Sequence, residues 1–174
     1  QHKGEIDMLE ETYLKIISAK TASLFAAATK VGSILSKKEN KTKEALEFYG
    51  KNLGLTFQIA DDALDYNSEL KLFGKEIGND FYEGKITLPI ILLYQKANQE
   101  EREKIKQFFD KKERSENEFN QVLILIKKYN IINECYRKAE HFINLASNSL
   151  SIFKESKEKE ILKNLTSFSL ERSF

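Results

Sequence analysis

Proline and glycine are scarce in this 174-residue chain, which contains seven glycines and one proline. Together they make up about 5% of the residues, against about 12% in an average globular protein. Neither occurs anywhere from Ile90 to Phe174. Sandwiches, barrels and βαβ units need turn residues at short intervals, so this scarcity excludes them and predicts an all-α fold of helices joined by polar turns.

Cysteine, histidine and net charge are also low. Cys135 is the one cysteine and there are two histidines, so the chain forms no intramolecular disulfide and lacks the ligands of a structural zinc site. The 28 basic and 27 acidic residues nearly balance, which gives no reason to expect nucleic-acid binding. The longest apolar run, Leu88 to Tyr94, is far shorter than the roughly 20 residues of a membrane-spanning helix. We therefore expect a cytoplasmic protein without an integral membrane segment.

Apolar residues recurring at three- and four-residue spacing predict a series of helices. The predicted ranges are about 9–35, 42–66, 87–98, 99–110, 116–129, 131–153 and 157–171. Asn98 and Ser115 are each followed three positions later by glutamate, which predicts a capping box at both helix starts. Residues 67–84 are predicted as a loop, and we expect a single helical domain over residues 1–174.

Gly50 and Gly54 lie four residues apart inside the predicted helix 42–66. A glycine in mid-helix costs up to about 1 kcal/mol relative to alanine. We interpret the pair as a place where this helix packs closely against another helix.

The segment from Phe57 to Asp65 combines three carboxylates with apolar neighbours. Asp61 and Asp65 lie on one face of the predicted helix, and Asp62 is adjacent to Asp61. Hard divalent cations such as Mg²⁺ prefer one or two carboxylates together with waters and substrate phosphates. The alternative is a solvated acidic face, but unneutralised charge is expensive on a helix this apolar. The pattern therefore predicts a Mg²⁺ site at Asp61, Asp62 and Asp65.

Three lysines are candidate partners of an anion bound to that metal. Lys20 lies between apolar neighbours in the first predicted helix, while Lys75 and Lys85 each follow a glycine. Each of them alone is typical of a solvated surface lysine. Together with the aspartates, they indicate a diphosphate that is held by Mg²⁺ and neutralised by lysines.

Six motifs, in this order and spacing, resemble the trans-polyprenyl (isoprenyl) diphosphate synthases. They are Lys20 to Phe25, Tyr49 to Gly54, Phe57 to Asp65, Leu72 to Lys75, Gly78 to Asp80, and Glu83 to Pro89. The match is strong over about residues 13–93, and Leu165 to Arg172 resembles the closing helix of the family. The chain resembles the C-terminal half of these enzymes, the long-chain octaprenyl type among them. The resemblance implies the C-terminal part of the isoprenoid-synthase helical bundle.

The resemblance also implies a role for each candidate residue. Asp61, Asp62 and Asp65 match the second aspartate-rich motif, whose Mg²⁺ bridges to an allylic diphosphate. Lys20, Lys75 and Lys85 match the lysines that contact this diphosphate. Lys20, Thr21 and Gln58 form the catalytic set, with Thr21 and Gln58 flanking the reacting carbons. The implied reaction is the head-to-tail condensation of isopentenyl diphosphate with an allylic diphosphate, catalysed by a homodimer.

Members of this family are about twice as long as this chain. The first aspartate-rich motif, the basic residues for isopentenyl diphosphate and the residues that limit product length belong to their first half, and this sequence shows none of them. We therefore expect the C-terminal portion of a full synthase, inactive alone. The alternatives are a non-catalytic helical subunit that associates with a full-length synthase, and a helical interaction module that shows no response to metal.

Overall fold

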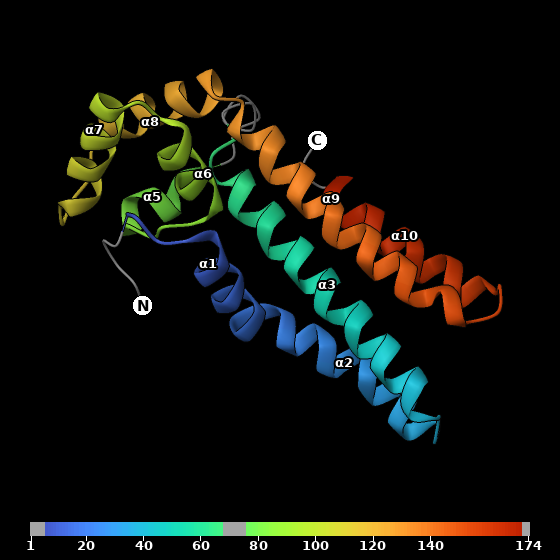
Figure 1. Cartoon of the computed structure of the whole chain (residues 1–174). Helices are drawn as coiled ribbons and strands as arrows, with labels where there is room; N and C mark the ends of the chain where they lie inside the picture. Colours follow the sequence, from blue (N-terminus) through green and yellow to red (C-terminus); the bar gives the residue numbers. More distant parts are fainter. Residues whose placement is uncertain (1–5, 68–75, 172–174) are drawn as a thin grey trace. The chain divides into compact units, whose positions relative to one another are not determined.

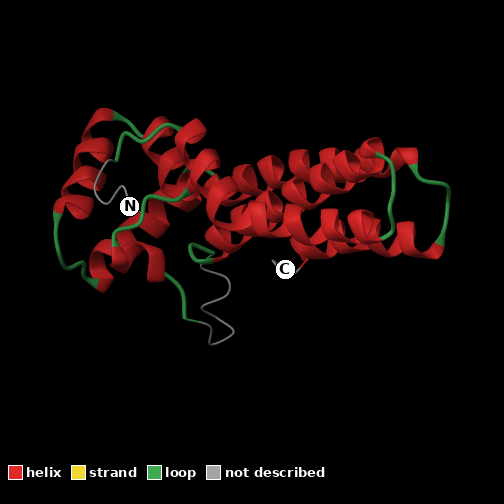
Figure 2. Ribbon diagram, turned by 90° about the horizontal axis from the view of Figure 1, so that it is seen from below, coloured by secondary structure: helices red, strands yellow, loops and turns green. Residues whose placement is uncertain are grey.

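The computed structural model describes residues 6–67 and 76–171, and all regular structure within these residues is helical (Figure 1; Figure 2). The first half of the chain forms α1 (Glu10–Ile17), the π-helical turn η1 (Ser18–Ala22), α2 (Ser23–Leu35), α3 (Asn40–Leu64), α5 (Asn79–Glu83) and α6 (Leu88–Lys96). The second half forms α7 (Gln99–Asp110), α8 (Glu116–Lys128), α9 (Ile131–Ser149), the 3-10 turn η2 (Leu150–Ile152) and α10 (Lys157–Glu171). The predicted all-α fold is confirmed.

Both predicted capping boxes are present. The Asn98 side chain accepts from the Glu101 amide at 2.9 Å, and the Glu101 carboxylate accepts from the Asn98 amide at 3.1 Å. Ser115 and Glu118 make the same reciprocal pair at the start of α8. Because these caps depend on residues three positions apart, local sequence was enough to place the starts of α7 and α8.

Two departures from the sequence prediction affect the candidate site. The first predicted helix is interrupted by the π-helical turn η1, which contains Lys20 and Thr21. The predicted loop contains the short helix α5, which lies between Gly78 and Gly84. These two glycines have φ angles of 92° and 71°, in the left-handed region that side chains disfavour. None of the helices in the described part of the chain combines the length and apolar composition that crossing a bilayer requires.

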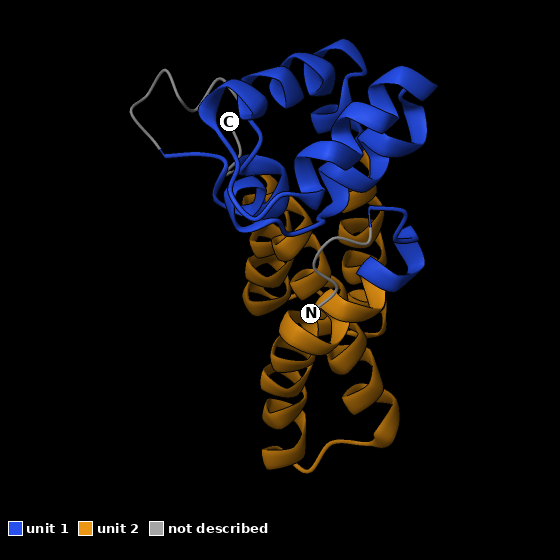
Figure 3. Ribbon diagram, turned by 90° about the vertical axis from the view of Figure 1, so that its left-hand side faces the viewer, with its two compact units in different colours: residues 1–13, 61–135 blue, residues 14–60, 136–174 orange. Residues whose placement is uncertain are grey.

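The chain divides into two compact units (Figure 3). Unit 1 comprises residues 1–13 and 61–135, and unit 2 comprises residues 14–60 and 136–174. The boundaries fall within α1, α3 and α9. The organisation of residues 1–174 as a single domain stays a prediction.

In unit 2, α2 and α3 approach closely at the two glycines of α3. A Cβ atom at position 50 would lie 2.8 Å from the carbonyl carbon of Phe25, and one at position 54 would lie 2.7 Å from the Cα atom of Ala22. Real side chains do not reach such distances, so close packing requires glycine at both positions, as predicted. The residues of α2 and η1 that are buried here are also small: Ala22, Ala26 and Ser33.

Phe25 of α2 packs against the core of unit 2, but several other large apolar residues of this helix are exposed. Leu24, Val31 and Leu35 are 71%, 48% and 77% exposed. Val31 and Leu35 belong to the apolar stripe of the first predicted helix, but unit 2 does not bury them. Its core forms instead around Tyr49, Leu53, Ala146 and Leu150.

The core of unit 1 is aromatic and surrounds α5. The Phe81 ring is fully buried, and its centroid lies 5.5 Å from that of Phe109 in α7 and 5.4 Å from that of Phe119 in α8. Residues 88–93 of α6 are buried as well. This packing fixes α5, the helix that precedes Lys85, against the rest of unit 1.

Candidate active site

The three aspartates at the end of α3 have different surroundings within unit 1. Asp61 is exposed, Asp62 is 5% exposed, and Asp65 is half-buried. The helical repeat places them around one end of α3, but burial separates them into one solvent-facing carboxylate and two that contact neighbouring elements.

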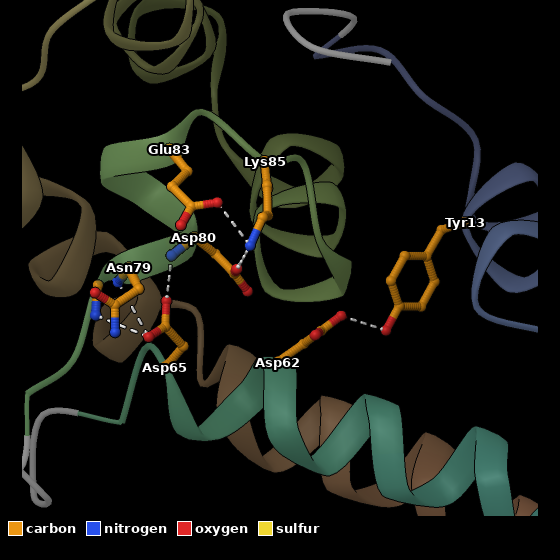
Figure 4. A network of polar contacts seen from close by, with 8 residues as sticks. Tyr13, Asp62, Asp65, Asn79, Asp80, Glu83 and Lys85 are labelled. Atoms are coloured by element: carbon orange, nitrogen blue, oxygen red, sulfur yellow. Dashed lines mark hydrogen bonds and ion pairs between the residues drawn. The ribbon is translucent and has the colours of Figure 1, made fainter. Parts of the chain in front are cut away.

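Asp62 is held by Tyr13 (Figure 4). The Tyr13 hydroxyl donates to Asp62 Oδ2 at 2.7 Å, and Tyr13 is only 2% exposed. Burial, and then the negative charge of Asp62, raise the pKa of Tyr13 well above its usual value. The tyrosine therefore stays protonated and remains a hydrogen-bond donor to the carboxylate.

Asp65 directly follows α3, and its carboxylate reaches the start of α5, where it accepts three backbone hydrogen bonds. Oδ1 accepts from the amides of Gly78 and Asn79 at 3.1 Å each, and Oδ2 accepts from the amide of Asp80 at 2.8 Å. Burial raises the pKa of Asp65, while the three amides oppose that shift by favouring the ionised form.

Lys85 follows α5 and is paired with two acidic residues. Its Nζ atom lies 2.8 Å from the Glu83 carboxylate and 3.0 Å from the Asp80 carboxylate. These hydrogen bonds, the one to Glu83 first, raise the pKa of Lys85 above its ordinary value. Lys85 therefore carries a full positive charge at neutral pH. Lys75 lies outside the described residues.

The remaining candidates lie in unit 2. Thr21 Oγ1 donates to Gln58 Oε1 at 2.8 Å, so the structure brings these two predicted catalytic residues together. Lys20, next to Thr21 in η1, is exposed. π-Helical turns are rare and frequently occur at functional sites.

Sequence reasoning assigned no role to Tyr13 or to Asp80. Asp80 was part of a recognised motif, and its position five residues before Lys85 was a usable signal. Nothing near Tyr13 in the sequence indicated its hydrogen bond, because Asp62 lies 49 positions away.

The comparisons with known proteins identify the family of the chain. The family model described as polyprenyl synthetase matches residues 1–126. The chain belongs to the polyprenyl synthetase family.

Among its relatives in this family, the all-trans-nonaprenyl-diphosphate synthase (geranyl-diphosphate specific) of Rhodobacter capsulatus is 36% identical over 172 residues, which are 99% of this chain and 52% of the relative. The short chain isoprenyl diphosphate synthase of Methanothermobacter thermautotrophicus is 34% identical over 167 residues, 96% of this chain and 51% of the relative. The chain thus spans about half the length of these relatives. One is named for a long product and the other for a short one, so the comparisons assign no product length.

Solved structures of polyprenyl synthases share the fold. The polyprenyl synthase of Caulobacter crescentus, complexed with calcium and isoprenyl diphosphate, matches with a TM-score of 0.92 and 34% identity, over 100% of this chain and 53% of that chain. The decaprenyl diphosphate synthase of Rhodobacter capsulatus matches with a TM-score of 0.92 and 31% identity, over 99% of this chain and 53% of that chain. The predicted part of the isoprenoid-synthase helical bundle is confirmed.

The family implies a divalent cation, and the carboxylates of α3 fit one in chemistry. Their oxygens are the hard ligands that Mg²⁺ prefers, and Asp61 presents its carboxylate to solvent. Within the described residues, no group of three or more histidine, cysteine, aspartate or glutamate side chains is arranged to hold a metal. A site of one or two carboxylates completed by waters and substrate phosphates needs no such group.

Replacing Tyr13 with phenylalanine should destabilise the protein by about 2 kcal/mol, because the buried Asp62 carboxylate loses the hydrogen bond from the Tyr13 hydroxyl. Tyr49→Phe is the matched control: its hydroxyl donates to the Leu162 carbonyl at 2.8 Å, a neutral partner, and we expect a loss of about 1 kcal/mol. Urea denaturation measures both. Equal losses would show that the charge of Asp62 adds nothing to the Tyr13 hydrogen bond.

Proposed function

We propose that this chain provides the part of a prenyltransferase that binds the allylic diphosphate and Mg²⁺. The whole enzyme condenses isopentenyl diphosphate with an allylic diphosphate, head to tail, to make a polyprenyl diphosphate. The observation that carries the proposal is the hydrogen-bonded network of unit 1, which anchors Asp62, Asp65 and Lys85 in a chain of the polyprenyl synthetase family. The resemblance of the Caulobacter crescentus synthase, described with calcium and isoprenyl diphosphate, supports a divalent cation and a diphosphate.

In unit 1, the metal-binding motif is Asp61, Asp62 and Asp65. Asp61 is the metal ligand that faces the solvent. Asp62 is oriented by Tyr13, and Asp65 is oriented by the amides at the start of α5. When bound, Mg²⁺ supplies positive charge that stabilises the departing diphosphate. Lys85 and Lys75 neutralise its other oxygens, and the raised pKa of Lys85 keeps that lysine charged.

In unit 2, Lys20 is the third diphosphate-binding lysine, and Thr21 and Gln58 face the developing allylic cation. The Thr21 hydroxyl donates a hydrogen bond to Gln58 Oε1, so the lone pairs of the Thr21 oxygen remain available and Gln58 is held in one orientation. Oxygen dipoles fixed in advance stabilise developing positive charge without having to reorganise. The homodimer and the cytoplasmic location stay predictions.

A thermal-shift experiment tests this function. Mg²⁺ with inorganic diphosphate should raise the melting temperature, because a ligand that binds only the folded state stabilises it. At about ten times the dissociation constant the gain is roughly 1.4 kcal/mol, or about 3–5 °C for a chain of this size. Neither component alone should give the full shift.

Asp61→Asn should abolish the shift, and Asp110→Asn is its control. Asp110 is an exposed aspartate of the same unit, so that variant removes the same charge without touching α3. A shift that persists in Asp61→Asn, or that disappears equally in Asp110→Asn, would contradict the assignment of the metal-binding motif.

A further inference from the structure

The Asp65 carboxylate accepts hydrogen bonds from backbone amides, whereas Asp61 is exposed to solvent. We propose that Asp65 is a positioning residue: it sets the backbone turn that carries Asp80 and Lys85. The structural part of this inference stands on contacts in unit 1, whereas its consequence for diphosphate binding rests on the proposed function of Lys85.

The first support is that both oxygens of Asp65 are engaged. Oδ1 accepts two amide hydrogen bonds and Oδ2 accepts a third, at 2.8 Å. A metal bound directly would have to share these oxygens with three backbone donors. Asp61, one turn earlier on α3, is exposed instead.

The second support is that α5 has no capping side chain of its own. The residue at its N-cap is Gly78, which has no side chain, and the first amides of a helix lack partners within the helix. Asp65, which directly follows α3, supplies the acceptor oxygens for these amides, as the side chain of an aspartate N-cap does within one helix. The Gly78 amide also donates to the Asp65 carbonyl oxygen at 2.8 Å, which ties the two segments twice.

The third support is that Asp80 connects this cap to Lys85. The Asp80 amide binds Asp65, the Asp80 carbonyl accepts from the Lys85 amide at 2.8 Å, and the Asp80 carboxylate accepts from Lys85 Nζ at 3.0 Å. A change at Asp65 therefore reaches the lysine through a single intervening residue.

The far end of the same turn is fixed by Arg114. Its guanidinium donates to the Tyr82 carbonyl at 3.3 Å and to the Phe109 carbonyl at 2.8 Å. A Cβ atom at Gly84 would lie 2.9 Å from the centre of this group, so the backbone before Lys85 passes directly over it. Asp65 and Arg114 thus hold the two ends of α5.

Amide hydrogen exchange of the full chain, without metal, tests the proposal. In Asp65→Asn, exchange at Asn79, Asp80 and Lys85 should rise about tenfold or more, because the negative charge is lost and one acceptor oxygen becomes an amide nitrogen that cannot accept, so the turn opens locally. Asp61→Asn removes the same charge four residues earlier in the chain and should leave these amides as in the wild type. Unchanged exchange in Asp65→Asn, or an equal rise in both variants, would overturn the positioning role.

Arg114→Met loosens the turn from its other end and touches no aspartate. We expect faster exchange at the Lys85 amide, and a diphosphate-dependent thermal shift reduced in both Arg114→Met and Asp65→Asn. A full shift in Arg114→Met despite faster exchange would show that the turn does not position Lys85 for binding. If the wild type shows no shift with Mg²⁺ and diphosphate, the proposed function fails, while the exchange measurement still decides what Asp65 does.

Discussion

Asp61→Ala should lower prenyl-transfer turnover by about 100-fold or more when this chain replaces the matching half of the Caulobacter crescentus synthase. The chain aligns with 53% of that protein, so such a chimera supplies the first half that this sequence does not contain. Removing one group that stabilises the charge of the transition state commonly costs a factor of 100 to 1,000, roughly 3–4 kcal/mol. Product formation from radiolabelled isopentenyl diphosphate measures the effect.

The isolated 174-residue chain should make no product in the same assay, because residues for isopentenyl diphosphate and the first aspartate-rich motif are not found in it. Asp110→Asn in the chimera is the control and should retain its turnover. Two results would contradict this account: product from the isolated chain, or an Asp61→Ala chimera as active as its parent.

Replacing Gly50 with alanine should lower the stability of the protein by about 2–3 kcal/mol, or the melting temperature by roughly 4–12 °C. The added methyl group would meet the backbone of α2 at Phe25, and backbone cannot yield as a flexible side chain does. The two helices would have to separate. Thermal and urea denaturation measure the loss.

Gly32→Ala is the matched control for that substitution. Gly32 also lies inside a helix, α2, but a Cβ atom there would meet nothing within 4 Å. Alanine should therefore stabilise the helix by about 0.5–1 kcal/mol. If both variants changed stability in the same direction, the close approach of α2 and α3 would not be the reason for Gly50.

Local signals in the sequence predicted much of this fold. The capping boxes at Asn98 and Ser115 depend on residues within one helical turn, which a sequence shows directly. Gly50 was also interpretable, because a mid-helix glycine has a known cost that close packing can offset. The order of six motifs identified the family correctly.

Features that depend on distant residues were not predictable. Helix α5 is only five residues long and is capped by Asp65, the residue that follows α3, so its own sequence resembles a loop. The exposure of Val31 and Leu35 was equally hidden, because helical periodicity marks an apolar face without saying whether that face is covered. The sequence predicted one metal role for three aspartates, whereas contacts with Tyr13 and the amides of α5 distinguish their surroundings.

The most direct test of the central claim is equilibrium binding of a radiolabelled allylic diphosphate, such as farnesyl diphosphate, to this chain with and without Mg²⁺. The account predicts saturable binding only with Mg²⁺, weakened about tenfold or more by Lys85→Ala, about 1.4 kcal/mol. Lys96→Ala is the control, because Lys96 has the same 41% side-chain exposure, lies in the same unit and pairs with Glu134. Two results would contradict the claim that this chain binds an allylic diphosphate through Mg²⁺ and Lys85: the same affinity with and without Mg²⁺, or an equal loss of affinity in both lysine variants.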